Sequence, residues 1–320
     1  MTRFRQAARL AGMVLGTGYC LFFFSETMFW SLWRPDENLF VRAGGVLFYS
    51  FLGYILMALI ATYRVRDVWT LMVAGACFGW VGEGVFAMTV FGAGGIPFPF
   101  TIAWTALAWH APLSVVVGWW WLGRALRAPR AWGALWLAAG LGLFWGTWGH
   151  GWRFETPPVV VDPGTFLLNA VVATAFLALG QWAIAAGDPA AFRPSRVGLA
   201  LAAAVTVAFF GILTVPQIPF APLVLVPLLA ITWLALRRAA RRGPEDAASV
   251  LADLAQPIRG RNAALLVVMP VVATSVYAGL GELEPEVHTH IVFALLTSLS
   301  GAVLFGSALW NIVRRHGLAP

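Results

Sequence analysis

Long apolar stretches separated by short polar segments run the whole length of the chain. Each stretch holds roughly 18–24 residues, enough to cross the ~30 Å hydrocarbon core of a bilayer as a helix. The longest polar connection, 237–262, leaves no room for a soluble domain. The pattern therefore predicts an all-α polytopic membrane protein, with one transmembrane domain over residues 1–320. The ten predicted spans are 8–30, 43–63, 68–91, 101–123, 131–150, 165–187, 197–214, 219–236, 263–282 and 289–312.

The positions of the arginines predict how these spans are oriented. All 21 basic residues are Arg, and 18 of them lie at the two termini or in alternate loops. The opposite loops hold only Arg34, Arg42 and Arg153. Because basic residues are enriched in cytoplasmic segments, both termini are predicted to be cytoplasmic, in the cell's inner (plasma) membrane.

The amino-acid composition also indicates that the lipid bilayer is the main partner of the protein. The residues are 60% hydrophobic and 11% charged. The net charge of +7 does not indicate nucleic-acid binding, because the arginines are dispersed among the cytoplasmic segments and form no continuous stripe. Most of the 17 Trp residues lie near span ends, which predicts aromatic belts at the two membrane boundaries. The alternative is an aromatic wall that binds a lipid or a pigment.

The connection 237–262 is interpreted as a cytoplasmic linker that contains a short interfacial helix. Pro244 and the two acidic residues after it suit a first helical turn. An apolar stripe follows at Val250, Leu251 and Leu254. Such a stripe predicts a helix that lies on the cytoplasmic leaflet.

Glu83 and His110 are an acidic and a basic residue that lie well inside the predicted spans. A charged side chain at mid-bilayer is costly, so it usually has a partner, a cavity or a task. Glu83 lies eight residues from the outer end of span 68–91, roughly 12 Å deep. His110 lies nine residues from the outer end of span 101–123, roughly 13 Å deep. Equal depth on consecutive antiparallel helices predicts that the two side chains meet, either as a reactive pair or as a structural hydrogen bond between helices.

Other ionisable residues fall in the same outer half of the membrane. Glu26 lies about one turn below the outer end of the first span, and His150 closes the fifth. They either complete one pocket with the deep pair or serve as a solvated carboxylate and a helix cap. The short loop before the last span is either solvated surface or a chelating segment, and its residues are Glu282, Glu284, Glu286, His288 and His290.

A glutamate and a histidine together in an apolar cavity are suited to proton transfer and to activating water. The candidate catalytic residues are therefore Glu83, His110 and Glu26. A divalent metal that activates water is an alternative, with His110, His150 and Glu83 as its ligands. The chain has no Lys, which excludes a retinal Schiff base and other lysine-dependent covalent cofactors. If the cofactor is a haem, its expected axial ligands are His110 and His150.

Two short motifs in residues 82–113 resemble the motif pair of CPBP-type intramembrane proteases, the family that processes CAAX proteins and bacteriocins. The motifs are Gly82-Glu83 and the run Trp109-His110-Ala111-Pro112-Leu113. Enzymes of that family activate water between glutamates and histidines, so the resemblance implies this role for Glu83 and His110. The chain departs from the family where Gly84 replaces a second glutamate, where an apolar residue replaces an arginine, and where no later span has His followed by Asn.

Three functional classes fit these observations. The first is an intramembrane enzyme of the hydrolase or hydratase type that acts on a lipophilic or membrane-borne substrate. The second is a proton- or cation-coupled transporter of small solutes, in which the Gly/Pro breaks at 92–99 and 215–222 form gates. The third is a non-catalytic or pigment-binding subunit of a larger membrane complex.

Overall fold

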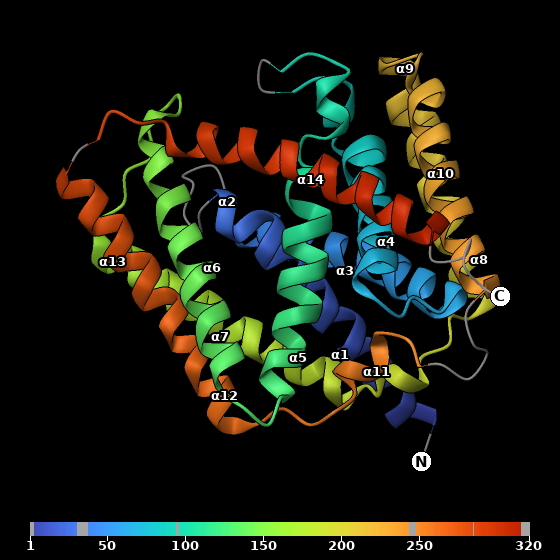
Figure 1. The fold of residues 1–320 in the computed structure, drawn as a ribbon, viewed down its shortest axis with the longest axis horizontal. Helices are drawn as coiled ribbons and strands as arrows, with labels where there is room; N and C mark the ends of the chain where they lie inside the picture. The colour runs from blue at the N-terminus through green and yellow to red at the C-terminus, as the bar shows by residue number, and fades with distance from the viewer. Residues whose placement is uncertain (1–2, 31–37, 94–95, 243–247, 284, 315–320) are drawn as a thin grey trace. The chain divides into compact units, whose positions relative to one another are not determined.

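The fold is described by a computed structural model that covers residues 3–30, 38–93, 96–242, 248–283 and 285–314 (Figure 1). Over these ranges the chain forms helices joined by short loops, and no β-strand occurs. The helices belong to two compact units, each assembled from three stretches of sequence. Unit 1 comprises Met1–Ser50, Gly118–Asp188 and Leu254–Leu296, and unit 2 comprises Phe51–Val117, Pro189–Asp253 and Thr297–Pro320.

Nine helical segments in the described residues are long and apolar enough to cross a membrane. They confirm the all-α, multi-pass architecture, whereas the sides of the termini remain predictions. The predicted span 131–150 forms helix α6 (Trp132–His150) but is not one of the nine, because its many Trp and Gly residues and its terminal His lower its mean hydropathy. The nine are Phe4–Thr27, Leu39–Tyr63, Val68–Phe86, Phe100–Arg127, Pro163–Ala186, Arg196–Gln217, Ala221–Arg242, Gly260–Leu283 and Thr289–Arg314.

Unit 1 is built on two helix pairs. Helix α1 (Arg3–Phe22) packs against α7 (Pro163–Ala186), and α6 packs against α13 (Val268–Leu283). A Cβ atom at Gly16 would lie 2.5 Å from the carbonyl oxygen of Gly180, so α1 and α7 approach backbone to backbone. Small residues permit this close packing between membrane helices.

Three tryptophans that the sequence places in the outer aromatic belt are core residues of unit 1. Trp145, Trp148 and Trp152 are buried. The indoles of Trp148 and Trp152 both donate to the carbonyl oxygen of Phe29, at 2.8 and 2.7 Å. The belt interpretation is therefore wrong for these three, because all three rings are buried in the core and two of the N–H groups bond inside the protein. Trp132, by contrast, is exposed.

The predicted interfacial helix corresponds in part to α11 (Leu251–Leu254). Its predicted first turn falls in 243–247, outside the described residues. The side chains of Val250, Leu251 and Leu254 are almost completely buried. The apolar stripe therefore packs inside the protein instead of facing lipid.

The residues that follow Leu254 hold the end of helix α5 (Leu122–Arg127) in unit 1. The carbonyls in the last turn of a helix have no donor within that helix. The buried side-chain amide of Asn262 supplies two, to the carbonyl oxygens of Ala125 and Ala128, each at 2.9 Å.

Replacing Asn262 with Ala is expected to lower the free energy of unfolding by about 2 kcal/mol, since the carbonyl of Ala128 loses this donor and the carbonyl of Ala125 keeps only the 3.3 Å hydrogen bond from the Ala128 amide. Thermal unfolding in detergent measures the effect. The control is Asn311→Ala, because the one side-chain hydrogen bond of Asn311 among the described residues is to the Ser307 carbonyl of its own helix, at 2.8 Å. Equal losses in the two variants would contradict the proposed role of Asn262.

In unit 2 the most buried spanning segment contains helix α4 (Val68–Val81), which packs against α10 (Ala221–Arg242). Asp67 begins α4 as its N-cap, accepting a hydrogen bond from the Thr70 amide at 2.9 Å. The remaining α-helices are α2 (Met28–Trp30), α3 (Leu39–Tyr63), α8 (Arg196–Phe209), α9 (Val215–Gln217), α12 (Gly260–Ala264) and α14 (Thr289–Arg314).

Candidate functional site

Helix α4 and the helix that carries the predicted histidine, η5 (Ala106–Trp121), approach closely in unit 2. A Cβ atom at Gly79 would lie 2.9 Å from the Cα atom of Ala106. Gly75, one turn earlier, faces the same helix. Glu83 continues this row at the next fourth position, and residues four apart share a helix face. The spacing therefore directs the carboxyl group of Glu83 towards η5.

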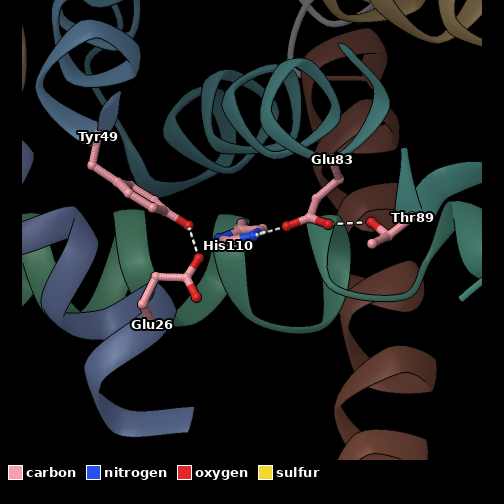
Figure 2. Close-up of polar contacts among 5 residues, drawn as sticks. All are labelled: Glu26, Tyr49, Glu83, Thr89 and His110. Atoms are coloured by element: carbon pink, nitrogen blue, oxygen red, sulfur yellow. Dashed lines mark hydrogen bonds and ion pairs between the residues drawn. The ribbon is translucent and has the colours of Figure 1, made fainter. Parts of the chain in front are cut away.

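Glu83 and His110 form a buried hydrogen-bonded pair (Figure 2). Oε1 of Glu83 lies 2.5 Å from Nε2 of His110. The two residues are 8% and 3% exposed. The other carboxylate oxygen accepts a hydrogen bond from the Thr89 hydroxyl, and the ring of Phe78 meets the imidazole edge-on at 5.8 Å. The contact predicted from equal depth is confirmed.

Both residues belong to helical segments that depart from α-helical geometry. Glu83 lies in the π-helical segment η2 (Gly82–Phe86), and His110 lies in η5, which is also π-helical. Pro112 in η5 has no N–H and cannot donate to the preceding turn. Segments of π-helix are rare and often occur at functional sites.

Two residues with left-handed backbone flank the pair. Met88 has φ 60° and Thr105 has φ 34°, a conformation that is uncommon for any residue but Gly and exceptional for a β-branched one. The carbonyl oxygen of Thr105 accepts from the amides of Trp109 and His110 at 3.1 and 3.0 Å. The strained residue therefore begins the turn that carries the histidine. Strain of this kind concentrates at functional sites.

A second interrupted helix in unit 2 meets the segment that carries Glu83. The π-helical segment η8 (Phe210–Thr214) ends α8, and the Thr214 hydroxyl donates to the carbonyl oxygen of Val85 at 2.6 Å. Thr214 is fully buried. Two predicted spans are thus interrupted at one place, beside the candidate acid.

Glu26 belongs to unit 1 and lies in a third π-helical segment, η1 (Phe23–Thr27). Its Oε1 accepts a hydrogen bond from the Tyr49 hydroxyl at 2.5 Å (Figure 2). The ring of Tyr49 meets Phe22 edge-on at 5.8 Å. This carboxylate is therefore held by a phenol within its own unit, a partner that the sequence does not indicate.

His150, also in unit 1, is completely buried at the end of α6. Its Nε2 lies 3.5 Å from the carbonyl oxygen of Pro285. The ring of Phe154 lies 5.8 Å from that of His150 and 4.4 Å from that of His288. The imidazoles of His288 and His290 are 5.8 Å apart. His150 and His288 therefore pack against the same aromatic ring.

Within the described residues of either unit, no three His, Cys, Asp or Glu side chains gather closely enough to hold a metal ion. The metal alternative with His110, His150 and Glu83 as ligands gains no support from this geometry. Glu83 and His110 can exchange a proton through their hydrogen bond, and the Thr89 hydroxyl fixes the orientation of the carboxylate.

Sequence reasoning missed the threonines of the site. Thr89 and Thr105 lie at the two ends of the irregular segment between Glu83 and His110, where no helical periodicity relates them to either residue. The spacing of Gly75 and Gly79 could have predicted the close contact between α4 and η5, because small residues four apart let two membrane helices approach.

Comparison with known proteins gives no match. No protein-family model, no curated protein sequence and no solved structure matches the chain. The likeness to intramembrane proteases therefore stays a likeness of two short motifs, and function is argued from the geometry of the site.

Proposed function

We propose that the protein is an intramembrane enzyme that uses Glu83 and His110 as a buried acid–base pair on a lipophilic or membrane-borne substrate. The observation that supports this proposal is the 2.5 Å hydrogen bond between the two side chains, held on π-helical and strained backbone. A hydrogen bond between two helices needs neither feature.

The chemistry we propose is activation of water. A water molecule beside the pair gives it one proton, and the resulting hydroxide bonds to an electrophilic carbon of the substrate. The pair then returns this proton to the group that leaves when the substrate's bond breaks. The Thr89 hydroxyl keeps one carboxylate oxygen in place, so the other stays directed at His110. Positioned acid–base groups of this type accelerate reactions by about 10²–10⁴-fold.

One observation favours a second candidate, a proton-coupled transporter. The interrupted helices that contain Val85 and Thr214 meet beside Glu83, joined by a 2.6 Å hydrogen bond. Discontinuous helices that meet at an ionisable residue are typical of transporter sites.

Reconstitution tests the proposal. Purified protein is placed in vesicles made from a total membrane lipid extract of the cells that express it. Mass spectrometry of the lipids then reports turnover, and a pH-sensitive dye reports proton movement. We expect a lipid product that the Glu83→Gln protein does not form. Proton movement without a product would overturn the enzyme proposal in favour of transport, and neither signal would favour a non-catalytic subunit.

The orientation in the inner membrane is also a proposal, based on the arginine distribution. Reporter fusions at either terminus are expected to give cytoplasmic signals. Fusions within 92–99 or 283–288 are expected to give signals from the opposite side. A cytoplasmic signal from either internal position would contradict the ten-span topology.

A further inference from the structure

Helix α10 of unit 2 ends in a dense group of arginines (Figure 1). Four of the 21 basic residues of the chain fall within the six positions 237–242, and all four side chains are exposed. Together with Leu234, one turn earlier, they line a hollow with a volume of about 420 Å³. The four are Arg237, Arg238, Arg241 and Arg242.

Helical spacing arranges these arginines in two rows. Arg237 and Arg241 are four residues apart, as are Arg238 and Arg242, so the members of each row share a helix face. Their Cβ atoms are about 5–6 Å apart. The planar guanidinium group is suited to bonding phosphate oxygens in pairs. Two guanidinium groups of one row can therefore bond the same phosphate.

The positive charge of this group is not balanced within the protein. Among the residues that the structure describes, the one interaction of the four guanidinium groups is that of Arg237, which lies 5.0 Å from the centre of the Trp233 ring. The acidic residues that follow in the sequence, Glu245 and Asp246, bring two negative charges against four positive ones. A net charge of +2 therefore remains to attract an anion.

The arginines lie at the level of the lipid headgroups. Residues 221–236, which precede them in α10, include no charged residue, and α10 is one of the nine segments that can cross a membrane. Because an arginine within the hydrocarbon is costly, this end of the helix lies at the membrane boundary. Trp233 and Leu234, both exposed, extend from the arginines towards the hydrocarbon. A lipid can thus place its headgroup at the arginines and its acyl chains beside these two side chains.

We propose that this hollow binds the headgroup of an anionic phospholipid, with a phosphate between the arginines of one row and an acyl chain beside Leu234. The proposal does not depend on the Glu83–His110 chemistry. The rule that places arginines at the cytoplasmic ends of spans does not require four of them to share one hollow. Clusters of about four to eight Arg or Lys residues beside a membrane helix recognise anionic lipids.

Photo-crosslinking tests the site. The full-length protein is placed in phosphatidylcholine vesicles with a trace of one of two probes, phosphatidylglycerol or phosphatidylcholine, each with a diazirine near the ester end of one acyl chain. Phosphatidylcholine has the same phosphate but carries a choline cation, which the arginines repel. Each arginine near an anionic headgroup contributes about fivefold in affinity. Two arginines on one phosphate therefore predict that label near Leu234 favours the phosphatidylglycerol probe by about 25-fold.

Arg237→Gln is expected to lower this preference about fivefold, and the double variant Arg238→Gln, Arg241→Gln is expected to lower it about 25-fold. The matched control is Arg314→Gln. Arg314 also ends a spanning helix and lies 4.5 Å from the centre of the ring of Trp310, one turn earlier, but it does not line the hollow. This control is expected to leave the preference unchanged. Circular dichroism establishes that each variant is folded.

Equal labelling by the two probes would overturn the proposal. An equal fall in preference in the Arg237→Gln and Arg314→Gln proteins would also overturn it, because it would indicate only an effect of net charge. An excess of soluble glycerol phosphate at constant ionic strength is expected to leave the preference unchanged. Loss of the preference in its presence would assign the hollow to a free phosphate ester and overturn the assignment to a lipid.

Discussion

Replacing Glu83 with Gln is expected to leave folded protein in the membrane and to reduce its activity by about 10²–10⁴-fold, the usual contribution of a general acid or base. Gln has nearly the same shape as Glu and can still hydrogen-bond, but it cannot take up a proton at this position. His110→Asn removes the other half of the pair and is expected to have the same effect. The product assay in reconstituted vesicles measures both, and thermal unfolding separates loss of chemistry from loss of fold.

The double variant sharpens this test. Residues that act as a unit are non-additive, so the Glu83→Gln, His110→Asn protein is expected to be no less active than either single variant. Glu286→Gln and His288→Asn are the matched controls, because they make the same chemical changes at exposed positions. Full activity of the Glu83→Gln protein would refute the acid–base role and leave a structural hydrogen bond between η2 and η5.

The spans and the central pair are readable from the sequence for physical reasons. A membrane helix needs about 20 apolar residues, which makes each span a conspicuous signal. Because a helix rises by a fixed length per residue, the position of a residue within a span gives its depth in the membrane. The contact between Glu83 and His110 could therefore be predicted without a structure. The chemical role of the pair does not follow from depth, because a hydrogen bond between helices would have the same spacing.

The backbone around the pair could not be predicted in the same way. The π-helical turns at Gly82–Phe86 and the left-handed conformation of Thr105 have no periodic signature, since they depend on packing between segments. The burial of these tryptophans could not be predicted from the sequence either. Trp148 and Trp152 suit a membrane boundary by composition, but their N–H groups bond the Phe29 carbonyl, a partner more than a hundred residues away in the chain.

Replacing Gly301 with Ala is expected to lower the free energy of unfolding by about 3 kcal/mol, as overpacking against a rigid backbone does. Helix α14 crosses η5 at this position in unit 2. A Cβ atom at Gly301 would lie 1.8 Å from the carbonyl oxygen of Leu107, so the backbone of one helix has to move. In a π-helix the carbonyl oxygen of Leu107 accepts a hydrogen bond from the N–H of residue 112. That residue is Pro112, which has no N–H, so this bond is missing.

The same substitution is expected to reduce activity even where the protein remains folded. Leu107 lies three residues before His110 on η5, and a shift of about 1 Å there can cost about 10²-fold in rate by misplacing the imidazole relative to Glu83. Gly306→Ala is the control, because Gly306 is on the same helix with no atom within 4 Å of the added methyl group. That change is expected to stabilise the protein by up to about 1 kcal/mol through helix propensity. If Gly301→Ala instead matched Gly306→Ala in thermal stability and in activity, the close contact between α14 and the helix of His110 would not exist in the membrane, and the support it gives to the site would be lost.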